Sequence, residues 1–251
     1  MAVTSADSSL WIRRFHPDPQ SKIRLVCFPH AGGSASFYFS ASRALRSDVE
    51  VLAVQYPGRQ DRRAEPCVTS ITELADCIFR VLRSMSGPPL ALFGHSMGAI
   101  TAFEVARRLE REMGAVAVRL FVSGRRAPSR HYDEYVHLRD DQGILTEVKA
   151  LNGTDARVFD NEEIMRMSLP SLRGDYRAIE SYRGGEGVQV SCPISMLVGD
   201  SDPRVTLDDA LAWRTHTTAE FDSHIFPGGH FYLGAQQSQV LKLIRDRLVT
   251  R

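Results

Sequence analysis

The sequence predicts an α/β fold: a predominantly parallel sheet with helices on both faces and a helical segment inserted into it. Three observations predict this class. Short apolar runs that suit buried strands alternate with stretches of helical periodicity along the 251 residues. Several of these runs lead directly into glycine-rich loops. One interval between predicted strands, from Gly124 to Pro193, is much longer than the about a dozen residues that a crossover helix needs.

The composition excludes several classes of partner. The chain has 31 Lys and Arg against 30 Asp and Glu, so no strong field favours nucleic acid or an anionic membrane. No apolar run approaches the roughly 18 residues that a membrane-spanning helix needs, and residues 1–9 lack the basic and apolar parts of a signal peptide. The four cysteines have no metal-ligand spacing, so we expect free thiols, no bound metal and a cytoplasmic location.

The N-terminal part contains three predicted strands. Residues 10–15 suit an edge strand, which ends before two prolines because proline cannot donate to a strand ladder. The apolar run at 23–28 suits a central strand and leads into a Pro-His-Ala-Gly-Gly loop at 29–33. A short helix at 37–45 and a third strand at 49–54 follow, and then a charged loop that contains several arginines.

The middle of the chain has a strand, a serine motif and a helix in direct succession. A helix with capping-box spacing begins at Ser70 and ends before the apolar strand at 90–93. Residues 94–98 read Gly-His-Ser-Met-Gly, and helical periodicity begins directly after them. In this context a G-x-S-x-G motif is typical of the sharp turn that exposes a nucleophilic serine at the carboxyl edge of a parallel sheet. An ordinary strand-to-helix turn that contains a serine is the alternative.

This context gives Ser96 and two backbone amides candidate roles. The amide of Met97, at the start of the helix, would point at an oxyanion that forms beside the serine. A glycine-rich loop after an early strand is where this architecture places a second donor. We therefore assign the second oxyanion donor to the amide of Ala31, with a plain turn at 29–33 as the alternative.

The long interval after the strand predicted at 118–122 indicates an inserted subdomain. Its helical pieces are expected at 144–151 and 162–168, followed by a helix that Pro170 begins. We see few features that would anchor this segment, so we interpret it as a mobile lid beside the carboxyl edge of the sheet. The insertion also contains an apolar stripe, and the alternative is that this stripe only packs the insertion against the core. The stripe consists of Met165, Leu169, Leu172, Tyr176 and Ile179.

The predicted organisation is one core interrupted by the lid. Residues 1–124 and 186–251 form the core, and residues 125–185 form the helical lid subdomain. The second part of the core supplies strands at 193–198 and 221–226 and a final helix. Both strands end in loops rich in glycine, aspartate or histidine.

The candidate general base is a histidine that follows the serine along the chain, as the architecture requires. His216 falls at the end of a predicted helix, and His224 lies inside a strand. His230 follows a strand in a glycine-rich loop, which can turn an imidazole toward Ser96. We therefore predict that His230 is the base.

The candidate acid lies between the serine and the histidine, where Asp200 and Asp202 compete. Asp202 lies further from the end of its strand, and the proline after it would stiffen the turn. We predict a triad of Ser96, Asp202 and His230, with Asp200 as a turn-capping carboxylate.

Five motifs in order resemble the type II thioesterases, the stand-alone editing enzymes of polyketide and nonribosomal peptide assembly lines. The similarity extends from about Trp11 to the final helix, and it includes the predicted triad and oxyanion positions. The motifs are Phe-Pro-His-Ala-Gly-Gly at 28–33, Tyr-Pro-Gly-Arg at 56–59, Gly-His-Ser-Met-Gly at 94–98, Leu-Pro with Leu-Arg-Gly-Asp-Tyr between 169 and 176, and Gly-His-Phe at 229–231.

The resemblance implies an α/β-hydrolase core with a helical lid. It implies hydrolysis of aberrant acyl groups from the phosphopantetheine arm of acyl or peptidyl carrier proteins, through an acyl-serine and without a cofactor of the enzyme's own. The acid of the family matches Asp202. We expect a monomer. Two alternatives stay open: a chain-releasing thioesterase of fatty-acid or polyketide synthesis, and a non-catalytic hydrolase-fold protein that binds an acyl ligand.

Two further groups of residues are candidates for substrate contact. Met165, Met167 and Leu172 are flexible apolar residues that could line an adaptable acyl channel. The resemblance implies an acidic carrier protein, and we expect Arg125 and Arg126, at the start of the insertion, to dock it. Simply solvated arginines are the alternative. The other arginines of the same two loops are Arg59, Arg62, Arg63 and Arg130.

Overall fold

The fold is built on a seven-stranded sheet in the order β1-β3-β2-β4-β5-β6-β7. The computed structural model describes residues 9–152 and 162–249, without the side chains of residues 152 and 162–165. All neighbouring strands are parallel except β1, which pairs with β3 in the antiparallel sense. The strands are β1 (Ile12–Arg13), β2 (Arg24–Phe28), β3 (Glu50–Val54), β4 (Leu90–His95), β5 (Leu120–Ser123), β6 (Ile194–Gly199) and β7 (Phe221–Phe226).

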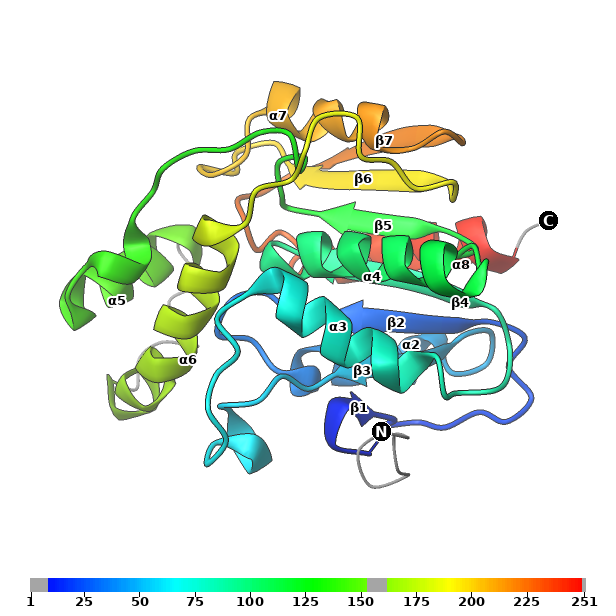
Figure 1. The fold of residues 1–251 in the computed structure, drawn as a ribbon, viewed down its shortest axis with the longest axis horizontal. Coiled ribbons are helices and arrows are strands. Elements are labelled where there is room, and N and C mark those ends of the chain that lie inside the picture. Colours follow the sequence, from blue (N-terminus) through cyan, green and yellow to red (C-terminus); the bar gives the residue numbers. More distant parts are fainter. Residues whose placement is uncertain (1–8, 153–161, 250–251) are drawn as a thin grey trace.

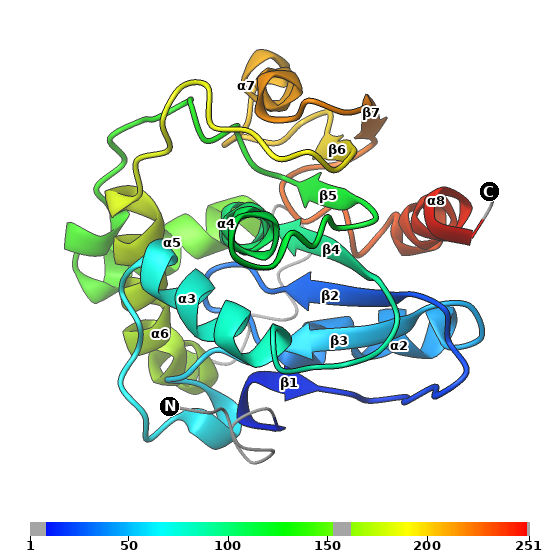
Figure 2. The ribbon, with the colours of Figure 1, turned by 45° about the vertical axis from the view of Figure 1, so that its right-hand side comes forward.

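Helices cover both faces of the sheet (Figures 1 and 2). α3 (Ile71–Leu82) and α4 (Met97–Met113) pack on one face with Val26 and Phe28 of β2, because successive strand residues point to opposite faces. α2 (Phe39–Leu45) and α8 (Gln237–Val249) pack on the other face with Leu25 and Cys27. The predicted class, a predominantly parallel sheet between helices, is confirmed.

The strands differ from the sequence prediction mainly at the edge. Residues 10–15 were predicted as one edge strand, but only Ile12 and Arg13 form β1. An edge strand has a neighbour on one side only, and this one is further limited because residues 9–11 are helical. The inner strands begin and end within about two residues of the predicted bounds.

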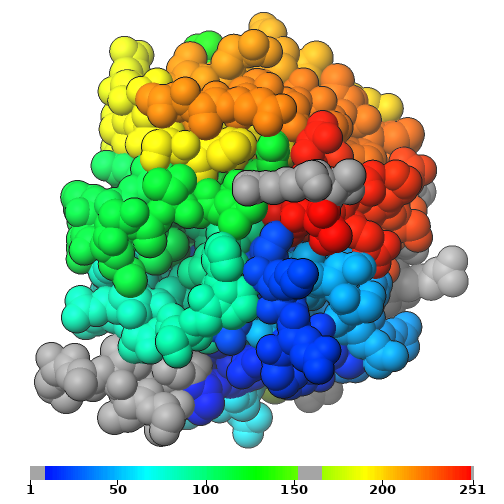
Figure 3. Space-filling view, turned by 90° about the vertical axis from the view of Figure 1, so that its right-hand side faces the viewer, coloured from blue at the N-terminus to red at the C-terminus, as the bar shows by residue number. Residues whose placement is uncertain are grey.

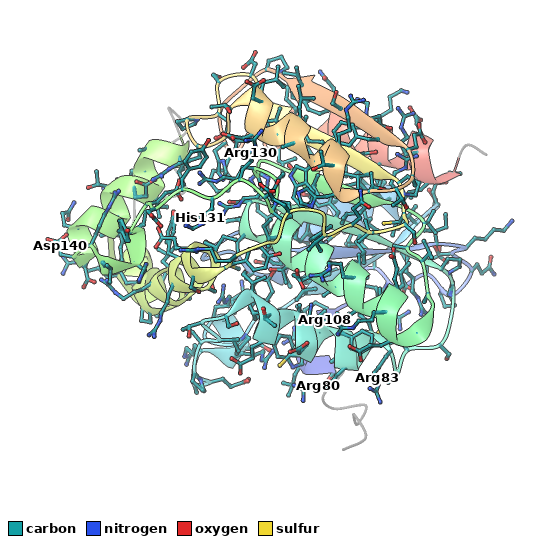
Figure 4. The ribbon with its side chains drawn as sticks, turned by 45° about the horizontal axis from the view of Figure 1, so that its top comes forward. Arg80, Arg83, Arg108, Arg130, His131 and Asp140 are labelled. Carbon is teal, nitrogen blue, oxygen red and sulfur yellow. The ribbon has the colours of Figure 1, made fainter. Side chains whose placement is uncertain are left out.

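The insertion lies at the carboxyl ends of the strands (left in Figure 1) and contains two long helices. It consists of a short 3-10 turn η3 (Val136–Leu138), α5 (Asp141–Asn152) and α6 (Glu162–Ser181). Asp140, labelled at the outer end in Figure 4, accepts a hydrogen bond from the Gly143 amide at 2.7 Å and caps the start of α5. Dividing the chain into core and lid at residues 125 and 185 stays a prediction.

The sequence prediction of two helices around Pro170 is wrong. Pro170 lies inside the single helix α6. A proline inside a helix removes its own backbone donor and crowds the carbonyl four residues earlier, but packing of the helix on its neighbours can outweigh that cost. The carbonyl of Pro170 also accepts a hydrogen bond from Sγ of Cys67 at 3.7 Å.

The end of the molecule opposite to the insertion is closed by the C-terminal helix. In Figure 3 the red surface of α8 lies beside the blue N-terminal segment and below the orange surface of β7 and its flanking loops. The remaining helical elements, α7 (Leu207–Leu211) and the 3-10 helix η5 (Ala212–His216), precede β7 and pack into the same core as α3 and α4. Along the described part of the chain no helix is long and apolar enough to cross a bilayer.

Candidate active site

Ser96 occupies a strained turn between β4 and α4. Its backbone has φ 54° and ψ −119°, a conformation that residues other than glycine rarely adopt. A Cβ at Gly94 would collide with the carbonyl of Gly98, and a Cβ at Gly98 would collide with the carbonyl of Phe28. The two glycines of the motif are therefore required by close backbone approach, as the sequence context predicts, and the turn presents Ser96 at the carboxyl edge of the sheet.

His230 and Asp202 form a buried hydrogen-bonded pair beside this turn. Nδ1 of His230 lies 2.8 Å from Oδ2 of Asp202, and both side chains are almost completely buried. The other carboxylate oxygen of Asp202 accepts from the Arg204 amide at 2.8 Å. A proton on Nδ1 that is donated to the carboxylate leaves Nε2 as the basic atom of the ring. Ser96 and His230 line the same cavity.

The competing acid and histidines lie elsewhere. Asp200 is exposed and accepts a hydrogen bond from the Gly228 amide at 3.0 Å, which is the turn-capping role that the sequence suggests. His216 is bonded to Ser129 and to a backbone carbonyl, and His224 pairs with Asp222. Of the candidates, the structure brings only His230 and Asp202 together.

The two predicted oxyanion donors line the cavity with Ser96. Met97 is the first residue of α4, where backbone N–H groups have no partner within the helix. The amide of Ala31 has no protein acceptor among the described residues. Its loop is held by the neighbouring Gly32, whose amide donates to Oδ2 of Asp175 at 2.8 Å. Both amides are thus placed to bind a negative oxygen that forms at Ser96.

Asp175 anchors this loop from the insertion, a role that the sequence analysis missed. Its buried carboxylate forms a bidentate pair with Arg59, with Nη–Oδ distances of 2.6 and 2.9 Å. Burial acts to lower the pKa of Arg59, but the attraction of Asp175 outweighs it and the pKa is raised. The Tyr-Pro-Gly-Arg and Gly-Asp-Tyr motifs were visible, but nothing in their local spacing shows that they meet.

The expectation that the insertion has few anchors is therefore wrong for α6. Besides Asp175, the hydroxyl of Tyr182, just after the helix, donates to Glu104 of α4 at 2.8 Å. Ala178 and Ile179 of α6 also pack into the main core. Periodicity shows which residues share a face, but it does not show which polar residues of that face find buried partners.

A cavity of about 420 Å³ lies between the edge of the sheet and the insertion. The core contributes Ser96 and His230, and the insertion contributes Leu172. Met167 is 71% exposed, so the prediction that it lines the channel is wrong, because it lies on the face of α6 opposite to the apolar stripe. The side chain of Met165 lies outside the described part of the structure.

The structure places Arg125 and Arg126 at the cavity that contains Ser96, and their role in docking a carrier protein stays a prediction. Arg126 is only 4% exposed, forms an ion pair with Glu134 and lies over the ring of Tyr132. Both arginines line the cavity rather than the outer surface. Arg130, labelled in Figure 4, is the exposed arginine of this segment. A solvated arginine cannot be distinguished from a buried one by loop position alone.

The arginines of the other loop divide in the same way. Arg59 is buried against Asp175, and Arg62 is buried between Glu65 and the ring of Trp11. Of the three, Arg63 is exposed. This loop is therefore braced mainly by its own arginines, and of the three only Arg63 fits the alternative of a solvated arginine.

Two further histidines surround the site without titrating near neutral pH. Burial, helped by the charges of His230 and Arg59, lowers the pKa of His30 to about 3. Burial also lowers the pKa of His95 well below its usual value. Nδ1 of His95 is bonded to Oγ of Ser123 at 2.9 Å. These two rings stay neutral, which leaves His230 as the histidine paired with a carboxylate at the serine.

The arrangement fits covalent catalysis through Ser96. No cluster of three or more His, Cys, Asp or Glu within the described ranges could hold a metal ion. A strained serine, a histidine–aspartate pair and two free amides together on a parallel sheet define a serine hydrolase of the α/β-hydrolase fold.

Comparison with known proteins narrows this class. The profile of the thioesterase domain family matches residues 23–248, and the chain belongs to that family. Thioesterase PikA5 of Streptomyces venezuelae is 49% identical over 249 residues, which cover 98% of this chain and 89% of that protein.

Solved structures agree with the assignment. The type II thioesterase BorB from the borrelidin biosynthetic cluster matches with a TM-score of 0.91 and 49% identity, covering 95% of this chain and 98% of that one. The RedJ thioesterase from the prodiginine biosynthetic pathway in Streptomyces coelicolor matches with a TM-score of 0.86 and 36% identity, covering 92% and 88%. The chain is a thioester hydrolase of the serine hydrolase type.

Proposed function

We propose that this thioesterase is an editing enzyme of the type II class, which removes aberrant or stalled acyl groups from carrier proteins of polyketide or nonribosomal peptide synthesis. The observation that carries the proposal is the pairing of His230 with Asp202 in the cavity where Ser96 and the two amides meet. The names of the relatives BorB and RedJ, each tied to a biosynthetic cluster or pathway, support the carrier-bound substrate.

The first half of the reaction transfers the acyl group to the serine. Oγ of Ser96 attacks the thioester carbonyl carbon while Nε2 of His230 takes its proton. Asp202 holds the ring in the required tautomer and stabilises the imidazolium. The amides of Ala31 and Met97 bind the oxyanion of the tetrahedral intermediate. The intermediate collapses, and the pantetheine sulfur leaves with the proton that His230 returns.

The second half releases the acyl group to water. His230 takes a proton from a water molecule, whose oxygen attacks the acyl-serine carbonyl. The same two amides bind the second oxyanion. Collapse of this intermediate restores the Ser96 hydroxyl with the proton from His230, and the product leaves as a carboxylic acid. No step uses a cofactor, because the phosphopantetheine arm belongs to the substrate.

The physiological setting follows from the substrate. The partner is an acyl or peptidyl carrier protein whose pantetheine arm enters the cavity of a monomeric enzyme in the cytoplasm. Four free cysteines support a reducing compartment. The buried positions of Arg59 and Arg62 remove them from the carrier-binding surface.

The test is hydrolysis of an acylated carrier protein, followed by the mass of the carrier. Ser96→Ala should lower the rate by several orders of magnitude, because the attacking oxygen is lost. Ser36→Ala, at a serine of the same cavity that has no role in the mechanism, should keep most of the activity. A wild-type protein that binds the acyl carrier without turnover would favour the non-catalytic alternative. Exclusive action on full-length product chains would favour chain release.

A further inference from the structure

Buried hydrogen bonds join the loop that carries His230 to the turn that carries Ser96. The hydroxyl of Tyr232, two residues after the catalytic histidine, lies 2.7 Å from Oγ of Ser123. The same Oγ lies 2.9 Å from Nδ1 of His95, the residue directly before the nucleophile. The carbonyl of Ser123 also accepts the Ser96 amide at 2.8 Å. Ser123 is therefore bonded to both catalytic segments, and the three side chains that form the hydrogen-bonded series are all buried.

The three residues of this series come from different strands at the carboxyl edge of the sheet. His95 ends β4 and Ser123 ends β5, and these neighbouring parallel strands pair at the two residues. Tyr232 lies in the loop after β7, which is two strands further along the sheet. Its ring stacks on Phe226, the last residue of β7, with centroids 5.3 Å apart. The hydroxyl of Tyr232 thus ties the loop of β7 to the strands beside the nucleophile.

The ring of His95 packs directly against the catalytic imidazole. The ring centroids of His95 and His230 are 5.1 Å apart, and Phe231 contacts both rings at 5.3 and 5.1 Å. The space around them is tight, because a Cβ on Gly124 would lie 2.6 Å from Cε1 of His95 and 3.6 Å from Cε1 of His230. Burial holds the pKa of His95 well below its usual value, so its neutral ring does not repel the imidazolium of His230.

The series lies behind the site and does not contact the substrate, because none of its three residues lines the catalytic cavity. The bond from Asp202 orients the His230 ring but does not set its distance from Ser96, which lies on another strand. Proton transfer needs Nε2 within about 2.6–3.2 Å of the serine oxygen. A misplacement of about 1 Å can lower a rate about a hundredfold. The hydrogen bonds behind the site are placed to control this distance.

We propose that Tyr232, Ser123 and His95 form a brace that holds His230 at the distance from Ser96 that proton transfer requires. The inference rests on the proposed catalytic roles of Ser96 and His230. The three residues of the brace are positioning residues, because they act through these two side chains and touch no reacting atom. Ser123 is the centre of the brace, since its hydroxyl can accept a hydrogen bond from one neighbour and donate one to the other.

The experiment measures kcat and KM for a butyryl N-acetylcysteamine thioester. Ser123→Ala breaks both bonds and should lower kcat about ten- to a hundredfold, whereas Tyr232→Phe breaks one bond and should cost less. KM should stay nearly unchanged, because the brace does not line the cavity. The double variant should be no slower than Ser123→Ala alone, because Ser123→Ala has already broken the bond that Tyr232→Phe removes.

Thr217→Val is the matched control for the loss of a buried hydroxyl. The hydroxyl of Thr217 is also bonded on both sides: it donates to the Cys192 carbonyl at 2.7 Å and accepts from the Ala219 amide at 2.9 Å. Thr217 is also buried, but it lies near the amino ends of β6 and β7, away from the triad. Thr217→Val should lower the thermal unfolding temperature about as much as Ser123→Ala does, and it should keep most of kcat.

A second pair of variants tests the His95 end of the brace. His95→Asn keeps a polar side chain that can bond Oγ of Ser123, whereas His95→Leu, of similar size, cannot. His95→Asn should therefore keep several-fold more kcat than His95→Leu. Equal kcat in these two variants would contradict a role for the hydrogen bond between His95 and Ser123.

The remaining outcomes separate the brace from the proposed function. Wild-type kcat in both Ser123→Ala and Tyr232→Phe overturns the brace and leaves the proposed function intact. Independent losses that multiply in the double variant also overturn it, and so does an equal loss of kcat in Thr217→Val, which would assign the effect to stability. If Ser123→Ala does not fold, Tyr232→Phe still decides, because it removes a single oxygen atom. Undiminished hydrolysis by Ser96→Ala would instead overturn the proposed function.

Discussion

The two helices of the insertion are attached to the molecule in different ways. α6 is fixed to the core by buried polar contacts, above all Asp175 with Arg59 and with the Gly32 amide. α5 packs mainly on α6 and η3, in a small apolar cluster that is separate from the two core clusters. Among the described residues, Glu147 of α5 forms an ion pair with Arg204 of the core, two positions after Asp202.

Because the two helices are attached differently, we expect the α5 side and the α6 side of the cavity to have different roles. The α6 side holds the loop that carries the Ala31 amide, so its order is part of the oxyanion site. The α5 side contributes Val148 to the cavity and depends on fewer contacts with the core. Regions with few core contacts open at low free-energy cost. We therefore expect α5 to adapt to the acyl chain, while α6 keeps the catalytic geometry.

The largest loss of activity is expected at Asp202, which lies outside both helices of the insertion. Asp202→Asn should leave His230 in the wrong tautomer and lower kcat by about 10⁴-fold. Asp200→Asn removes an exposed turn contact and should cost far less. Both rates are measured at one pH after circular dichroism has shown that each variant is folded. The reverse ranking would mean that Asp200 is the catalytic acid.

A smaller but clear effect is expected at the anchor of α6. Asp175→Asn leaves the buried guanidinium of Arg59 without its charge partner, and breaking such a pair costs about 3–5 kcal/mol of stability. The Ala31 loop should loosen as well, and the loss in kcat should be below the roughly 10²–10³-fold of a deleted oxyanion donor.

The matched control for this anchor is Asp141→Asn. Asp141 pairs with Arg173 at 2.7 Å, but its side chain is 68% exposed, so the pair is worth under about 1 kcal/mol. Thermal unfolding and kcat are measured for both variants. Equal and small losses from the two substitutions would show that α6 is no better anchored than α5.

The smallest expected effect is a change in how kcat/KM depends on acyl-chain length. This change should differ between a substitution on α5 and one on α6. Val148→Trp, on α5, should fill the cavity and lower kcat/KM several-fold for long acyl thioesters while acetyl is hydrolysed almost normally. Leu172→Trp, on α6, should lower activity for all chain lengths, because Leu172 packs directly against Gly32 of the oxyanion loop. A series from acetyl to decanoyl measures both. If kcat/KM depended on acyl-chain length in the same way for both variants, α5 and α6 would not have the different roles proposed here.

Local sequence predicts the parts of this molecule that depend on neighbouring residues. The strand, glycine and helix around Ser96 require one particular turn, and the order of loops along a parallel sheet leads to His230 and Asp202. The continuity of α6 through Pro170 could not be predicted in this way. It depends on packing against distant elements, which outweighs the local preference of proline.

Contacts between distant residues are the part that the sequence conceals. Arg59 and Asp175 are 116 residues apart, and each looks like an ordinary charged loop or helix residue. Arg125 and Arg126 are adjacent, yet Arg126 has a half-buried glutamate partner and Arg125 has none among the described residues. Such differences arise from the three-dimensional surroundings of each side chain, so only the structure shows them.

The most direct test of the account is to trap the acyl-serine. The enzyme is mixed with a butyryl thioester, quenched in acid before the steady state, and analysed by intact mass and by peptide mapping. We predict a mass increase of one butyryl group on the peptide that contains Ser96, and no increase in Ser96→Ala. Undiminished hydrolysis by Ser96→Ala, or a butyryl group found on another residue such as Cys67, would contradict the central claim.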